Sequence, residues 1–437
     1  MTKNITFKSL LGTCLLVLAG ASHAKIKLRG YGSMGISSIV ESSNDVEGQE
    51  SPDRLGIISK RADFYRDLRF GLNLTSPLDT SGNLTFIGQI AGEHVNIFYG
   101  TAPRYIPGDP NVRITMSKLS YDVNDSLNVA IGVLPVPFWL ISQETLVSYT
   151  YPWSRPPIEV YSSADVISMT GVALSHNFGI GPLWISSQLA AGNINYRETP
   201  WTEDMTVSVR DFQGGILEVA IEYEDILTRF VWGKILPADI YYDTTEEVEL
   251  TPDGETIPAN YELTASSEME MKTIEFSSIG ARGFYQSVFF MAEYVNRVLR
   301  SGDGTGLRGS ALSNSNSYIK GYYATLGYEI GDIMPHFTYA AHRTVLDKDR
   351  YSTALSQSIP VPELEESAEY AGAQRAINAV NKSQQSMSLG LNYSFSSKTT
   401  LKFEASQTQV HDKYGGLGDL EPGSKFTLVS AGAAFVF

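Results

Sequence analysis

The residues that could carry catalysis in this 437-residue chain are few and widely separated. Two stretches, 30–35 and 304–309, have the GxGxxG spacing that lets a backbone approach a phosphate. Neither stretch opens a helix directly after a strand, so neither indicates a dinucleotide site. No HExxH zinc motif and no GxSxG serine elbow is present. The histidines are His23, His94, His176, His336, His342 and His411.

Composition excludes further classes of site. The single cysteine, Cys14, rules out a disulfide framework, a zinc cluster and a CxxC redox pair. The 48 acidic residues outnumber the 33 Lys and Arg, which argues against a nucleic-acid binder. A serine beside His336 or His342 would make a hydrolase, and this stays an alternative without motif support. We expect no enzyme, no cofactor and no metal.

The first 24 residues have the three parts of a secretory signal peptide. Lys3 and Lys8 precede an apolar stretch at 10–21, and small residues lie at Ser22 and Ala24. The apolar stretch is shorter than the roughly 20 residues that a spanning helix needs, although an anchor helix is the alternative. Cleavage after Ala24 would give an exported, more acidic chain without cysteine.

Most of the remaining sequence alternates apolar and polar residues with period two. Segments such as 127–133 and 387–393 belong to runs of about ten residues, the length of a strand that crosses a bilayer at a tilt. The polar set mixes Glu, Arg, Asn and Ser, which suits a strand with lipid on one face and water on the other. We expect sixteen strands, at 25–40, 64–76, 83–95, 113–123, 127–136, 165–178, 183–195, 214–223, 226–236, 272–283, 286–300, 317–330, 333–345, 384–396, 399–411 and 423–437.

The connections between these strands alternate in length. Short turns include 124–126, 224–225, 331–332 and 396–398. The long connections are 41–63, 96–112, 137–164, 196–213, 237–271, 301–316, 346–383 and 412–422. Short turns at one end and long loops at the other are typical of outer-membrane barrels with both termini on the periplasmic side. The sequence therefore predicts an all-β fold, a transmembrane antiparallel β-barrel over 25–437.

The chain ends with an alternating apolar strand whose last aromatic residues are Phe435 and Phe437. At this end the sequence resembles the Gram-negative outer-membrane porin family, in which such a final strand is the signal for the outer-membrane assembly machinery. The resemblance implies a general porin-like barrel of sixteen strands, a homotrimer, and a third external loop that folds inward and narrows the pore.

The third long connection, 137–164, is the expected constriction loop. Pro135, Pro137, Pro152, Pro156 and Pro157 fix its backbone and reduce the entropy lost on ordering. It departs from the acidic constriction loop of general porins, and packing against a neighbouring subunit is the alternative. The residues expected at the constriction are Trp139, Glu144, Tyr149, Tyr151, Trp153, Arg155 and Glu159.

Charged residues in the polar set of each strand are expected to line the pore, because a charge facing lipid costs about 2–4 kcal/mol near mid-bilayer. Each could instead form a wall ion pair without a role in transport. The acidic excess suggests a cation preference. The expected lining residues are Asp67, Arg69, Glu93, Lys118, Glu218, Glu222, Arg229, Glu275, Glu293, Arg297, Lys402 and Glu404.

Three further features are expected outside the pore. The acidic connection 237–271 is interpreted as a solvated loop, with cation binding beside lipopolysaccharide as the alternative. A short helix is expected at 363–380. Aromatic residues at strand ends fit the interfacial girdles of a membrane barrel. They are Tyr121, Tyr223, Tyr328 and Phe395.

Together these patterns predict an outer-membrane porin for passive diffusion of small hydrophilic solutes and ions. A substrate-selective channel is the first alternative, because Trp139, Tyr149, Tyr151 and Trp153 could form a stacking path. An enzyme or a structural barrel is the second. The expected partners are outer-membrane lipid and lipopolysaccharide, the assembly machinery, small solutes and two further copies of the chain.

Overall fold

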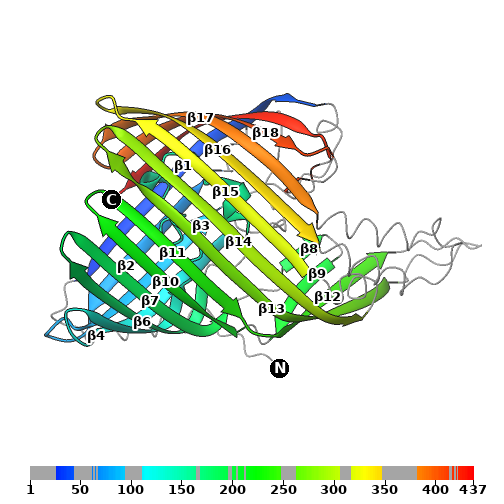
Figure 1. Cartoon of the computed structure of the whole chain (residues 1–437), viewed down its shortest axis with the longest axis horizontal. Helices are drawn as coiled ribbons and strands as arrows, with labels where there is room; N and C mark the ends of the chain where they lie inside the picture. The colour runs from blue at the N-terminus through cyan, green and yellow to red at the C-terminus, as the bar shows by residue number, and fades with distance from the viewer. Residues whose placement is uncertain are drawn as a thin grey trace, which may run out of the picture.

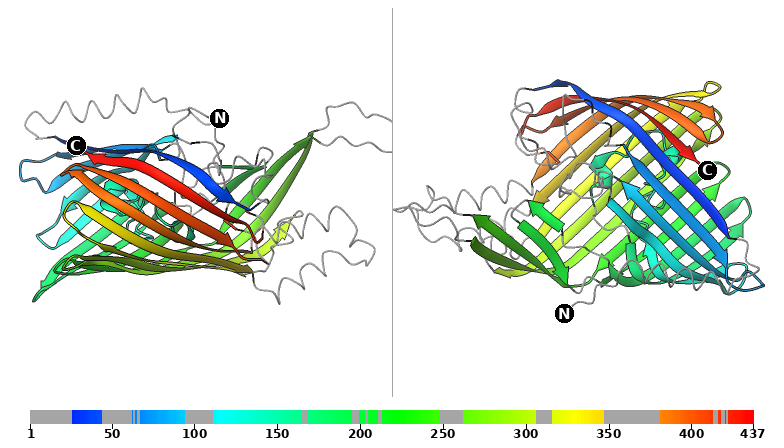
Figure 2. Two further views of the ribbon diagram at one scale, coloured as in Figure 1. Left: turned by 90° about the horizontal axis from the view of Figure 1, so that it is seen from above. Right: turned by 180° about the vertical axis from the view of Figure 1, so that it is seen from behind.

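The structure is a computed structural model that shows a β-barrel with a small sheet extending from one end (Figures 1 and 2). The described residues are 26–43, 62, 64, 67–93, 111–163, 168–194, 199–202, 205–210, 213–247, 262–305, 316–346, 381–412, 416–417, 420 and 422–437.

Sixteen antiparallel strands close the barrel. Each pairs with the next barrel strand along the chain, and β1 pairs with both β2 and β19, so the ring has no free edge. The barrel strands are β1 (Lys27–Ser42), β2 (Arg69–Pro77), β3 (Leu84–Glu93), β4 (Asn111–Asp122), β5 (Leu127–Pro135), β6 (Ser168–Ile180), β7 (Leu183–Ile194), β10 (Gln213–Tyr223), β11 (Ile226–Ile235), β13 (Glu262–Tyr285), β14 (Val288–Thr305), β15 (Asn316–Tyr328), β16 (Ile333–Leu346), β17 (Lys382–Ser396), β18 (Thr399–Val410) and β19 (Lys425–Val436).

The two faces of each strand differ as the alternation predicts. In β17, Ser386 and Ser388 are buried on the inner face, while Met387 and Leu389 are 50% and 67% exposed on the outer face. An exposed apolar outer wall is stable in hydrocarbon, and a closed ring pairs every ladder N–H and C=O group there. The sixteen expected strands are therefore confirmed. No helix among the described residues is long and apolar enough to cross a membrane.

Three short strands extend the sheet beyond the barrel. They are β8 (Thr199–Thr202), β9 (Met205–Arg210) and β12 (Ala238–Glu247). The first part of β13, 262–271, continues past the barrel and pairs with β12, which pairs in turn with β9. Figure 1 shows this extension where β13 begins. The expectation of irregular loops at 196–213 and 237–271 is therefore wrong in part, because β13 offers a long backbone edge on which these segments form a ladder.

Some expectations lie outside the described residues. These are the signal peptide at 1–24, the helix at 363–380 and most of the long connections at 41–63, 96–112 and 346–383.

The barrel closes where the two ends of the chain meet. The backbone amide and carbonyl groups of Gly30 and Phe437 exchange two 2.9 Å hydrogen bonds. The rings of Phe437 and Phe435 lie over Gly30 and Gly32, where a Cβ would overlap them. Gly30 and Gly32 of the 30–35 motif therefore make room for the terminal aromatics.

Aromatic side chains mark the outer wall at the end with the short turns. Tyr121, Tyr223, Tyr328 and Phe395 are all exposed and lie within a few residues of a short turn. Aromatic rings at this height fit the membrane–water interface.

Glu275 lies on the outer wall, so its placement in the pore is wrong. It shares the outer face of β13 with the exposed Ile279 and forms ion pairs with Arg300 at 2.9 Å and Lys234 at 4.0 Å. These residues lie toward the end of the barrel with the long connections, and the two nearby cations compensate the carboxylate.

Candidate functional site

The connection between β5 and β6 lies inside the barrel. Residues 136–163, which we call the inner segment, contain a 3₁₀ turn, η1 (Ser148–Thr150), and one helical turn, α3 (Ile158–Tyr161). The inner segment bonds to inward residues of β1, β2, β11 and β13–β18. These strands surround the lumen, and Figure 2 shows the helical turn within the ring.

Apolar packing fixes the first part of the inner segment to the wall. Phe138, Trp139 and Leu140 belong to a buried cluster that also contains Val231 and Phe276 from the barrel strands. The rings of Phe138 and Phe276 lie 4.6 Å apart between centroids. The lumen beside these strands is therefore filled by side chains.

Charged wall residues hold the backbone of the same part. Glu293 accepts hydrogen bonds from the Leu140 amide at 2.9 Å and from the Tyr161 hydroxyl at 3.1 Å. Arg229 donates to the Leu140 carbonyl at 2.9 Å and forms a 3.0 Å ion pair with Glu218. These three charged groups are compensated by one another and by peptide groups of the inner segment.

Lys402 holds the middle of the inner segment. Its ammonium group donates to the carbonyl oxygens of Ser148, of Tyr151 at 2.6 Å and of Trp153 at 2.7 Å. The same nitrogen lies 4.6 Å from the centroid of the Tyr151 ring. One wall residue from β18 therefore satisfies three backbone carbonyls of a turn.

The next residues bind the wall on both sides of the barrel closure. Arg155 forms a 2.6 Å ion pair with Asp67, and it also donates to the Ser37 hydroxyl at 3.3 Å. Glu404 accepts a 3.2 Å hydrogen bond from the Ser154 amide. The inner segment thus reaches β1 and β18 as well as the residues that precede β2.

Glu144 binds the wall near the end with the short turns. Arg282 donates to both of its carboxylate oxygens, at 2.6 and 2.8 Å, the bidentate geometry that makes such pairs strong. This pair borders a pocket of about 470 Å³, the mouth pocket, which Glu222, Glu224 and Asp225 also line. Negative charge therefore gathers where the lumen opens toward the short turns.

The helical turn α3 is bound through Glu159. Gln384 donates to its carboxylate at 3.0 Å, and His342 Nδ1 donates to its backbone carbonyl at 2.9 Å. Burial raises the pKa of Glu159 above the usual carboxyl value, and the hydrogen bond from Gln384 partly offsets this. The other ring nitrogen of His342 accepts from Thr344 at 2.8 Å, so both nitrogens are used in holding the loop.

Three of the four aromatic residues expected at the constriction are buried. Trp139, Tyr151 and Trp153 are 1%, 3% and 1% exposed, and the Trp153 indole N–H donates to the Thr338 hydroxyl at 2.8 Å. Tyr149 is half-buried. The buried rings serve packing between the inner segment and the wall.

The remaining expected lining residues lie on the other strands. Arg69 donates to the Tyr151 hydroxyl at 2.8 Å. Lys118 and Arg297 are half-buried on the inner wall. The side chain of Glu93 lies outside the described residues.

Sequence reasoning missed several wall residues that hold the inner segment. Arg282, Thr338 and Gln384 each bond to it from a strand whose position was predicted. Extending the inward alternation along 272–283, 333–345 and 384–396 would have placed all three inside. The sequence does not indicate which part of the inner segment each of these three residues binds.

No group of three or more His, Cys, Asp or Glu suited to a metal ion is found among the described residues. No protein-family model and no curated protein sequence matches the chain.

Solved structures do match it. The outer-membrane channel DcaP of Acinetobacter baumannii is 12% identical, with 95% of this chain and 97% of that chain covered and a TM-score of 0.52. The trimer form of OmpT, an outer-membrane protein of Vibrio cholerae, is 10% identical, with 95% and 99% covered and a TM-score of 0.50. The chain has the outer-membrane porin fold. An anion-selective porin from Comamonas acidovorans is a weaker likeness, with 12% identity, 95% and 100% covered and a TM-score of 0.49.

Proposed function

We propose that this chain forms a water-filled outer-membrane channel for the passive diffusion of small hydrophilic solutes and ions, narrowed by the inner segment. The observation that carries the proposal is the attachment of residues 136–163 to inward side chains on opposite sides of the lumen. A segment held in this way reduces the open cross-section without closing the barrel at its ends.

The attachment of the inner segment to the barrel wall supports a constriction of fixed shape. Ion pairs Glu144–Arg282 and Arg155–Asp67 fix two points of the segment, and the ammonium of Lys402 fixes a third. The Arg155–Asp67 pair and Lys402 are shielded from water by packing, and such charges are screened less by salt than exposed ones. The constriction therefore keeps its shape across the range of salt in which a diffusion channel works.

A substrate-selective channel is the second candidate function. Its stacking path would need exposed aromatics, but Trp139, Tyr151 and Trp153 are packed against the wall, which leaves Tyr149. This favours diffusion without a dedicated aromatic path. The fold family suggests that the chain works as a homotrimer in the outer membrane, inserted by the assembly machinery through the strand that ends in Phe435 and Phe437.

Planar-bilayer recording of the refolded protein tests the proposal. Steady currents that are linear in voltage and unaffected by individual solutes are expected. Currents that one class of solute blocks would favour the selective channel instead. The absence of any current from heat-modifiable, folded protein would exclude both channel functions.

Deletion of 139–160 tests the constriction. Single-channel conductance should rise, because conductance increases with the narrowest cross-section. Deletion of the equally long stretch 352–373, from the connection between β16 and β17, is the matched control and should leave conductance unchanged. An unchanged conductance after deletion of 139–160 would show that the inner segment does not form the constriction.

A further inference from the structure

The connection between β18 and β19 turns back into the end of the barrel. Its described residues, which we call the terminal connection, are 411–412, 416–417, 420 and 422–424. The Gly416 amide donates to the Leu420 carbonyl at 2.7 Å, so this part of the chain forms a compact turn. Leu417 and Leu420 are 7% and 5% exposed. Two apolar side chains of this connection are therefore packed against protein and withdrawn from water.

The contacts of Leu420 show which side of the wall the terminal connection lies on. Leu420 packs in a buried cluster with Ile39, Val410 and Phe426, which come from β1, β18 and β19. Gln409, the neighbour of Val410, is exposed on the outer wall. Because alternate residues of a barrel strand face opposite sides, Val410 faces the lumen. The terminal connection therefore lies within the end of the lumen that the long connections surround.

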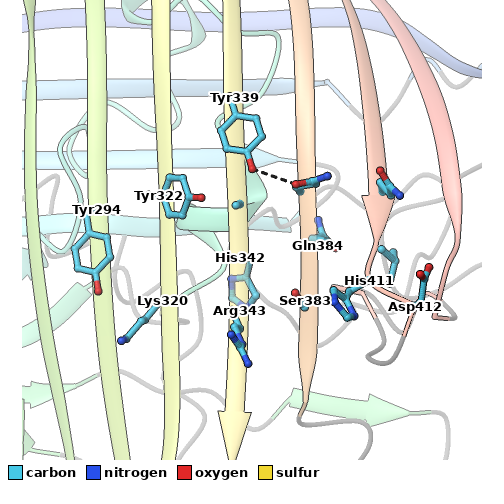
Figure 3. A pocket seen from close by; sticks show the side chains of 14 residues that line it. Tyr294, Lys320, Tyr322, Tyr339, His342, Arg343, Ser383, Gln384, His411 and Asp412 are labelled. Atoms are coloured by element: carbon cyan, nitrogen blue, oxygen red, sulfur yellow. Dashed lines mark hydrogen bonds between the residues drawn. The ribbon is translucent and has the colours of Figure 1, made fainter.

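One wall residue binds the backbone of the terminal connection. The side-chain carbonyl of Gln384, near the start of β17, accepts a hydrogen bond from the Leu417 amide at 2.7 Å. Gln384 is 3% exposed and lies between His342 of β16 and His411, which follows β18 (Figure 3). A buried backbone amide needs such an acceptor, because without one it loses its hydrogen bonds to water and gains none in return.

The same side-chain amide also binds the inner segment. Its nitrogen donates to the carboxylate of Glu159, in α3, at 3.0 Å. The two partners fix the orientation of the Gln384 amide, because a backbone N–H only donates and a carboxylate accepts. If either connection moved away, a buried polar atom of Gln384 would lose its partner. Each connection therefore stabilises the position of the other.

We propose that the terminal connection forms a second narrowing of the lumen, at the end with the long connections, and that Gln384 is the positioning residue that couples it to the inner segment. A solute that enters from this end passes the terminal connection before it reaches the constriction. The effect on permeation rests on the proposed channel function, whereas the contacts of Gln384 do not depend on it.

Thiol labelling tests the coupling without relying on a current. The single cysteine of the chain is Cys14, so protein produced from residue 25 onward carries no thiol, and Leu417→Cys introduces one. A charged maleimide should label folded Leu417→Cys protein slowly, because the position is buried. Adding Gln384→Met should accelerate labelling about tenfold, since loss of the two hydrogen bonds raises the population in which the terminal connection is detached. Unchanged labelling would overturn the coupling.

Gln385→Met is the matched control. Gln385 is the next residue of β17, but it is exposed on the outer wall and accepts a hydrogen bond from Tyr339. This change should leave the labelling of Leu417→Cys unaltered. Equal acceleration by Gln384→Met and Gln385→Met would show a general loss of stability in β17 and would contradict the role assigned to Gln384.

Exchange of the two partners separates positioning from a general effect on folding. Gln384→Glu alone places two carboxylates together and should accelerate labelling. Gln384→Glu combined with Glu159→Gln should return labelling to the slow rate, because the new amide can donate to the new carboxylate, which still accepts from the Leu417 amide. Fast labelling of this exchanged variant would count against the coupling.

Planar-bilayer recording tests the narrowing itself. Single-channel conductance should rise in Gln384→Met and return toward the wild-type value in the exchanged variant. Accelerated labelling with unchanged conductance would show that the terminal connection is attached through Gln384 but does not narrow the lumen. Absence of current from the folded wild type would overturn the channel function instead, and the labelling would still decide the coupling.

Discussion

Lys402 brings a full charge into the packed contact between the wall and the inner segment. The residue is buried, and its ammonium compensates the carbonyls of Ser148, Tyr151 and Trp153. Lys402→Met keeps the length of the side chain but leaves these carbonyls without their donor. We expect the free energy of unfolding to fall by about 2–3 kcal/mol, the size of lost hydrogen bonds to a charged group. Denaturant titration in detergent micelles, followed by tryptophan fluorescence, measures it.

Lys398→Met is the control, because Lys398 is exposed in the turn between β17 and β18. Equal stability of the wild type and Lys402→Met would contradict the role assigned to the ammonium.

The alternation of residues 399–411 predicts that Lys402 faces inward, but its partners are roughly 250 positions earlier in the chain. Sequence patterns therefore predict which wall residues face inward, and only the folded path of the inner segment shows what they bind.

Among the strands, β1 and β19 close the ring by pairing with each other. The ring of Phe437 lies over Gly30, an aromatic residue covering a glycine across a strand pair. Gly30→Ala would place a methyl group where the ring lies, so closure should become less favourable. We expect a smaller fraction of folded protein after refolding, measured from the heat-dependent shift in gel mobility.

Gly179→Ala in β6 is the matched control, since a Cβ there makes only ordinary contacts with Trp184. A folded fraction reduced equally by both changes would point to backbone propensity instead of the ring contact.

The sixteen barrel strands could be predicted because each has a lipid face and a wet face. β8, β9 and β12 lie outside the barrel ring, and their pairing depends on the projecting edge of β13.

Across the whole molecule, the net charge of −15 says little about the lumen by itself. Many inward carboxylates are compensated, as in Asp67 with Arg155 and Glu218 with Arg229. Others bind backbone amides of the inner segment, as Glu293 and Glu404 do. The acidic composition suggests a cation preference. This preference must come from carboxylates that are not compensated by a basic side chain or a backbone amide.

The mouth pocket supplies these carboxylates. Glu222, Glu224 and Asp225 line it beside Arg282, whose guanidinium is already bound to Glu144. Neutralising the three as Glu222→Gln, Glu224→Gln and Asp225→Asn should lower the cation-to-anion permeability ratio about twofold, because a charged opening concentrates counter-ions.

Reversal potentials across a salt gradient measure this ratio. The difference in the ratio between the triple variant and the wild type should shrink in molar salt, because screening shortens the range of the charges. Neutralising three acids in other short turns is the matched control for net charge, and it should leave the ratio close to that of the wild type. The control residues are Asp125, Glu329 and Asp332. If both triple variants lower the ratio equally, selectivity follows the overall charge of this end of the barrel, and the position of the mouth carboxylates has no special part in it.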